Sequence, residues 1–168
     1  MTTGGDAFDD VLAANSHYSK GFTLSGLEPV AARGLAIVTC MDSRIEPLPL
    51  LGLRAGDAKI LRNAGARVTD DVLRTLVLAT HLLGVDRIMI VPHTRCKMAS
   101  MSQDAVVDAI EQHSGVDATS LDFGLIVDQR RTLERDVTRT RAWPFLPAGV
   151  RVGGFVYDVD TGALEHVC

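Results

Sequence analysis

The chain has 168 residues, of which 46% are hydrophobic, so it is long enough for one domain with a sizeable core and too short for two comfortable ones. Its net charge of −4 gives no reason to expect a nucleic-acid or membrane partner. Three widely spaced cysteines, Cys40, Cys96 and Cys168, do not make a disulfide framework and suit a reducing compartment. These properties predict a single cytoplasmic domain over residues 1–168.

The predicted elements alternate between helix and strand. The acidic N-terminus has no apolar segment of a secretory signal, and it leads into an amphipathic helix over about 6–18 with Phe8, Val11 and Leu12 on one face. Almost wholly apolar runs, typical of strands buried on both faces, occur at 34–39, 58–61, 87–91 and 123–127. Helices are predicted at 68–84 with Thr69 as N-cap, at 102–113 before Gly115, and at 128–141.

The tail from residue 150 onward predicts a strand, an Asp-Thr-Gly turn and a short return strand. Strands that alternate with helices indicate an α/β fold with a mainly parallel central sheet flanked by helices. We therefore expect a core over about 35–168, with the helix at 6–18 as an N-terminal arm.

Two loops at neighbouring strand ends carry the residues best suited to bind a metal. His93 and Cys96 follow the strand at 87–91, and Cys40 follows the strand at 34–39. Sites in parallel sheets form beyond the carboxyl ends of strands, so these three side chains are expected to meet there. Two thiolates and one imidazole form a ligand set that favours zinc and leaves a fourth position open.

The same residues also have simpler interpretations. Cys40 alone is more often a small buried hydrophobe than a ligand, and His93 with Cys96 alone is a weak metal signal. A phosphatase loop needs five residues between Cys and Arg, whereas Cys40 and Arg44 have three between them. The two loops together are the specific signal, and Cys168 is expected to have no role.

The segments "CMDSR", "RNAGARVTDDVLRTL" and "PHTRC", in this order, resemble the β-class carbonic anhydrases, particularly the short bacterial forms. The resemblance implies that Cys40, His93 and Cys96 bind Zn²⁺ and that Asp42 and Arg44 form a catalytic dyad. It also implies that Arg62 to Gly65 border the active site. A homodimer or homotetramer is implied as well, with the N-terminal helix packed on a partner subunit.

One position departs from the family pattern. The family usually has glycine after the second zinc cysteine, and this chain has Lys97. A glycine there permits a backbone geometry that a residue with a Cβ resists. Lys97 either reshapes the pocket or points into solvent, and the sequence leaves both open.

The chemistry expected of this site is reversible hydration of CO₂ to bicarbonate by a zinc-bound hydroxide, the reaction of carbonate dehydratase, a lyase. Zinc with two thiolates is a weaker Lewis acid than zinc with three imidazoles, so Asp42 is needed to orient the nucleophile and Arg44 to hold Asp42 in place. Two alternatives remain open. The same site could hydrolyse carbonyl sulfide or carbon disulfide, or Asp42 could be a permanent fourth zinc ligand in a non-catalytic protein.

Overall fold

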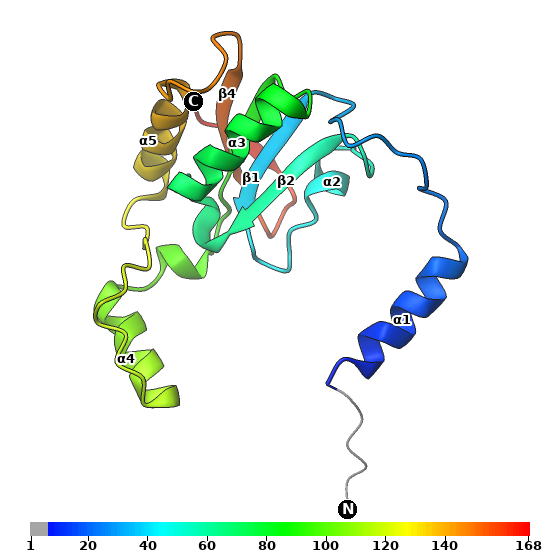
Figure 1. Ribbon diagram of the computed structural model, residues 1–168. Coiled ribbons are helices and arrows are strands. Elements are labelled where there is room, and N and C mark those ends of the chain that lie inside the picture. Colours follow the sequence, from blue (N-terminus) through cyan, green and yellow to red (C-terminus); the bar gives the residue numbers. More distant parts are fainter. Residues whose placement is uncertain (1–6) are drawn as a thin grey trace, which may run out of the picture.

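The structure is a computed structural model that describes residues 7–168 (Figure 1). The helices are α1 (Asp9–Lys20), α2 (Pro47–Leu50), α3 (Asp70–Leu82), α4 (Gln103–Ser114) and α5 (Gln129–Arg141). The strands are β1 (Leu35–Cys40), β2 (Ala58–Asn63), β3 (Arg87–Val91), β4 (Arg151–Tyr157) and β5 (Leu164–His166). Two short 3₁₀ turns, η1 (Ala64–Ala66) and η2 (Lys97–Ala99), follow β2 and β3.

Over the described residues the strands form one sheet in the order β2-β1-β3-β4-β5. The pairs among β2, β1, β3 and β4 are parallel, and β5 returns antiparallel to β4. Cys40 lies opposite Asn63 of β2, and Thr39 lies opposite Val91 of β3. The expected α/β fold with a mainly parallel sheet is confirmed, and β1 and β3 end side by side.

One face of the sheet is covered by α3 and α5 (Figure 1). Every residue of β1 is buried, which is the burial that its apolar run predicts for a central parallel strand. The core on this face is built from β1, β3, β4 and the inner sides of the two helices, and it includes Val38, Leu73, Leu76, Ile90, Leu133 and Val137. This packing fixes the strand ends on which the site depends.

The helix boundaries follow the capping residues of the sequence. The Thr69 side chain accepts a hydrogen bond from the Val72 backbone N–H at the start of α3, as predicted for an N-cap. Ser102 caps α4 in the same way, and Gly115 ends that helix in the left-handed conformation. Asp128 caps α5.

The prediction of a strand at 123–127 is wrong. Gly124 has a φ of 62°, which interrupts an extended strand, and the place next to β3 is taken by β4. Ile126 is buried because its segment lies against η2, where its backbone N–H donates to the carbonyl of Met98. Val127 is fully exposed.

The N-terminal arm is helical but shifted from the expected 6–18. Helix α1 begins at Asp9 and ends at Lys20, and residue 6 lies outside the described residues. Figure 1 shows α1 and α4 extending away from the sheet. No residue of α1 is buried, so its apolar side chains have no core contact within this subunit.

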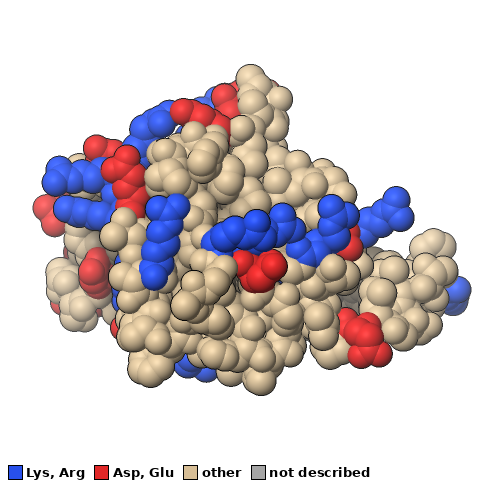
Figure 2. Space-filling view, turned by 90° about the horizontal axis from the view of Figure 1, so that it is seen from above, with Lys and Arg blue, Asp and Glu red and all other residues tan. Residues whose placement is uncertain are grey.

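Charged side chains are unevenly distributed over the surface. Seen from above, Lys and Arg side chains form a row across the molecule (Figure 2). Asp86, the residue before β3, lies 3.7 Å from Arg87 and 3.8 Å from Arg151, so it offsets part of the basic charge at the amino ends of β3 and β4. In residues 7–168 no helix is long and apolar enough to cross a membrane.

Candidate metal centre

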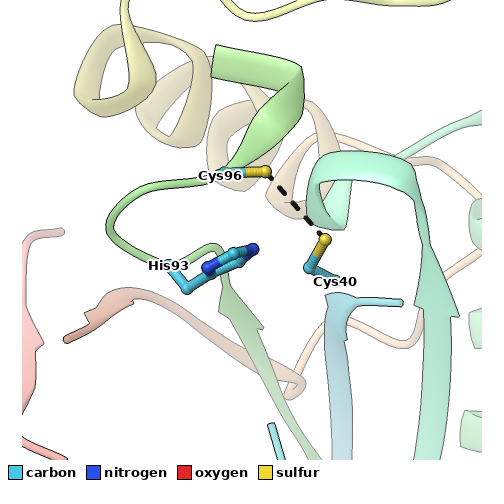
Figure 3. Close-up of side chains that lie close together, drawn as sticks. All are labelled: Cys40, His93 and Cys96. Atoms are coloured by element: carbon cyan, nitrogen blue, oxygen red, sulfur yellow. Dashed lines mark hydrogen bonds between the residues drawn. The ribbon is translucent and has the colours of Figure 1, made fainter. Parts of the chain in front are cut away.

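The side chains of Cys40, His93 and Cys96 point toward one another where β1 and β3 end (Figure 3). All three residues are buried, and their possible ligand atoms lie within 4.8 Å of one another. The two sulfur atoms are 4.0 Å apart. Tetrahedral zinc with Zn–S bonds of about 2.3 Å requires a sulfur–sulfur distance of about 3.8 Å. The spacing therefore fits a zinc ion without rearrangement.

His93 presents one free nitrogen to this space. Its Nδ1 lies 2.9 Å from the Thr94 carbonyl oxygen, so Nδ1 carries the proton and donates it. The other nitrogen, Nε2, is buried and has no hydrogen-bond partner among the described residues. Burial lowers the pKa of His93, which favours the neutral ring that a metal requires. A buried nitrogen lone pair without a partner is costly, and a metal ion satisfies it.

Burial also affects the charged form of Cys96. Burial raises the pKa of the Cys96 thiol, while the backbone N–H groups of Met98 and Ala99 act in the opposite direction. A bound cation favours the thiolate that a metal ligand must be. The residues present thus fit zinc, with Cys40, His93 and Cys96 as the side chains that would hold it.

Asp42 and Arg44 form a two-pronged ion pair beside these ligands. Arg44 Nε donates to Asp42 Oδ1 at 2.9 Å, and Nη2 donates to Oδ2 at 2.7 Å. These hydrogen bonds hold the pKa of the Asp42 carboxyl well below its usual range and raise that of Arg44. Asp42 Oδ2 lies 3.7 Å from His93 Nε2, so an ionised carboxylate faces the metal position while Arg44 holds it.

The loop after β2 borders the site. The Gly65 backbone N–H donates to Cys40 Sγ at 3.4 Å. Arg62 Nε donates to the Cys40 carbonyl at 2.9 Å, and Nη2 donates to the Asp42 carbonyl at 2.5 Å. Residues 62–65 therefore touch both the first ligand and the dyad, as the sequence resemblance implied.

Lys97 is exposed at the start of η2. Among the described non-glycine residues, positive φ angles occur at Ala66 and Arg95, so the backbone at Lys97 does not require glycine. Of the two interpretations left open by the sequence, the structure supports the one in which this side chain points to solvent.

Several contacts that hold the site carry no local sequence signal. Gln129 Nε2 donates to the His93 carbonyl at 2.8 Å from the start of α5. Val159, in the turn after β4, donates its N–H to Thr94 Oγ1 at 3.1 Å. An ion pair joins Arg95 to Asp160 in that same turn. These residues lie far along the chain from the ligands, and only the folded topology brings them close.

Fold and site together define a metal-binding enzyme domain built on a parallel α/β sheet. A family model described as carbonic anhydrase matches residues 35–140. Beta-carbonic anhydrase 1 of Mycobacterium tuberculosis is 36% identical over 159 residues, which cover 95% of this chain and 96% of that protein. The chain belongs to the β-carbonic anhydrase family, whose members are carbonate dehydratases, a class of lyases.

Solved structures agree with this assignment. The carbonic anhydrase of Streptococcus mutans has a TM-score of 0.90 and 36% sequence identity, covering 99% of this chain and 100% of that one. A second group of relatives is named for a different activity: a carbon disulfide hydrolase of Acidithiobacillus thiooxidans is 34% identical, covering 79% of this chain and 76% of that protein. The fold is therefore shared by relatives with two named activities.

Proposed function

We propose that this protein catalyses the reversible hydration of CO₂ to bicarbonate with one Zn²⁺ per chain held by Cys40, His93 and Cys96. The observation that carries the proposal is the buried Nε2 of His93, which has no partner among the described residues and faces two sulfur atoms at zinc spacing. Zinc bound there supplies Lewis acidity that lowers the pKa of a coordinated water.

Asp42 and Arg44 supply the orientation that this chemistry needs. The Asp42 carboxylate accepts the hydrogen bond of the nucleophile and directs a lone pair toward the carbon atom of CO₂. Arg44 keeps this carboxylate ionised and in place through its paired hydrogen bonds, and its Nη2 also lies 3.3 Å from the Arg95 carbonyl oxygen. The Asp42–Arg44 pair supports Asp42 as a catalytic residue, rather than as the permanent fourth ligand of a non-catalytic site.

The surroundings of the two cysteines are apolar. Side chains packed around them include Ile45, Leu50, Ala66, Met98 and Tyr157. Such surroundings suit a small apolar substrate, and carbon disulfide is as apolar as CO₂. The carbon disulfide hydrolases among the relatives make this second substrate class, with carbonyl sulfide, the alternative to test.

Parallel assays on zinc-verified protein separate these functions. We expect rapid CO₂ hydration by stopped-flow measurement and slow or no hydrolysis of carbonyl sulfide and carbon disulfide. The Cys96→Ser protein, checked for folding, controls for activity without the metal site. Hydrolysis of carbon disulfide at a higher kcat/KM than CO₂ hydration would reverse the assignment, and zinc without any activity would favour a non-catalytic protein.

The working assembly is proposed to be a homodimer or homotetramer. Its support is the exposed apolar side chains of α1 and its flanks, among them Phe8, Val11, Leu12, Tyr18 and Phe22. An isolated helix of this length is marginally stable in water, so a second subunit is the simplest surface against which it can pack. We further propose a cytoplasmic location, because Cys40 and Cys96 must stay reduced to bind zinc.

A further inference from the structure

The sulfur of Cys40 accepts a backbone hydrogen bond from a loop that lies well away from it in the sequence. The donor is the Gly65 N–H, at 3.4 Å and 25 residues further along the chain. A hydrogen bond to a ligand sulfur reduces the electron density that the sulfur gives to a metal. In a site with two thiolates, such a bond raises the Lewis acidity that the reaction needs.

The loop that carries this donor has a demanding conformation. Gly65 has a φ of 80° and Ala66 a φ of 58°, so two successive residues are left-handed. The Asn63 side chain bridges the loop, because its Oδ1 accepts from the Arg67 N–H at 2.9 Å and its Nδ2 donates to the Arg67 carbonyl at 2.7 Å. An outer support is needed to keep this loop against Cys40, since left-handed non-glycine residues persist only where the surroundings fix them.

That support comes from Asp136 on α5. Asp136 Oδ2 accepts from Arg67 Nε at 2.9 Å and from the Val68 backbone N–H at 3.1 Å. The Asp136 side chain is only 7% exposed. Arg67 Nη1 also donates to the Gly124 carbonyl at 3.0 Å, so the arginine joins the loop to the segment before α5.

A buried ion pair adds little to stability, because desolvation of the two charges offsets most of their attraction. Apolar residues of similar volume at the same positions are often equally stable. The value of the ion pair lies in fixing one geometry. We propose that Asp136 is a positioning residue for the metal centre. By fixing Arg67 and the Val68 N–H, it keeps the Gly65 N–H hydrogen-bonded to the Cys40 sulfur. This hydrogen bond in turn raises the Lewis acidity of the bound metal. This inference rests on the proposed zinc function and assigns a role to a residue more than 90 positions from Cys40.

The test compares Asp136→Asn with the wild type, both loaded with Co²⁺ in place of Zn²⁺. The substituted amide retains an oxygen but loses the charge that pairs with Arg67, so the loop loosens. We expect the sulfur-to-cobalt charge-transfer band to move to longer wavelength, because a thiolate without its hydrogen bond is a stronger donor. We also expect metal affinity, measured by chelator competition, to fall roughly 10-fold and the midpoint of the pH–rate profile of the zinc enzyme to rise.

Thr140→Val is the matched control. Thr140 is also buried on α5, but its Oγ1 donates to the Asp136 backbone carbonyl within the helix and leaves the Asp136 carboxylate untouched. The substitution should lower thermal stability and leave the band, the affinity and the pH midpoint unchanged. A charge-transfer band that moves equally in both variants would show a general effect of helix destabilisation and overturn the proposal.

Arg67→Gln provides a second variant if Asp136→Asn does not fold. It removes the charged partner and leaves the Val68 N–H bonded to Asp136, so the same spectral shift is expected at smaller size. A metal-loaded variant with a wild-type band and affinity overturns the role of Asp136 and leaves the zinc function intact. A wild type that binds neither metal overturns both.

Discussion

The surroundings of His93 hold its imidazole in the form that a metal ligand requires. Its Nδ1 is committed to the Thr94 carbonyl, and its Nε2 faces Cys40 and Cys96 without a partner among the described residues. A structural histidine in the core would have both nitrogens satisfied. The sequence spacing predicted His93 as a metal ligand, and the fold adds the tautomer that this role requires.

Removing either sulfur ligand should remove the metal. Cys40→Ser and Cys96→Ser each leave two of three protein ligands, and a serine hydroxyl is a poor zinc donor at neutral pH. We expect wild-type protein to contain about one zinc per chain and each variant to lose most of it, as measured by elemental analysis. Cys168→Ser is the control and should retain zinc, because Cys168 packs beside Gly154 and is not part of the group that could hold the metal.

Arg44→Ala tests the dyad separately from the metal. The side-chain hydrogen bonds of Arg44 go to Asp42 and to the Arg95 carbonyl, so zinc should remain without them. Turnover should fall on the order of 10²-fold, because Asp42 loses the group that orients it. Arg74→Ala, which breaks an exposed ion pair with Asp71, should have wild-type turnover. Full activity of the Arg44 variant by stopped-flow assay would exclude the dyad mechanism.

At the scale of elements, the η1 turn contains Gly65, a glycine whose position leaves too little space for a side chain. A Cβ on Gly65 would lie 2.9 Å from Ile126 Cδ1, and its φ is positive. We expect Gly65→Ala to lower the free energy of unfolding by about 1–3 kcal/mol, from backbone strain and the contact with Ile126. Urea denaturation measures this loss.

Two further glycines separate the effect of backbone strain from the effect of steric crowding. Gly52 has a positive φ but open space around its Cβ position, so Gly52→Ala should cost about 1 kcal/mol from strain alone. Gly149 has open space and no positive φ, so Gly149→Ala should change stability by less than about 0.5 kcal/mol. Equal losses at all three positions would contradict this explanation.

The elements most readily predicted were those with strong local signals. The buried run of β1, the N-cap Thr69 and the Gly115 terminus all lie where the sequence placed them. The segment 123–127 was misassigned because a short apolar run is compatible with a strand or with a loop packed against other loops. Ile126 is buried beneath Gly65 and Met98, which is a tertiary contact that no local pattern encodes.

The residues proposed for the site differ in how far the sequence indicates them. The candidate ligands and the dyad lie in two short motifs, whereas Gln129 and Asp136 reach backbone groups of other segments from α5. Every residue except proline has both a backbone carbonyl and an N–H, so a hydrogen bond to one of these groups does not require a particular side chain at that position. Such support therefore leaves no motif in the sequence.

At the scale of the whole molecule, α1 determines assembly in our proposal. Leu12 is 61% exposed in the single subunit, and Leu12→Glu should weaken a subunit contact by placing a charge in an apolar interface. Light scattering should then show a smaller mass than for wild type. His17→Glu, on the opposite side of the helix, is the control and should leave the mass unchanged. A wild type that is monomeric at all concentrations would exclude the assembly.

The adjacency of β1 and β3 has a consequence for the order of folding events. The Thr39 hydroxyl donates to the Val91 carbonyl at 2.8 Å, which joins the two strands just before Cys40 and His93. The ligands cannot meet until this non-local pairing exists, and parallel pairing between distant segments is slow. Metal capture should therefore be a late step of refolding. A cobalt charge-transfer signal would time the completion of the sheet, appearing after the helical circular dichroism signal has recovered.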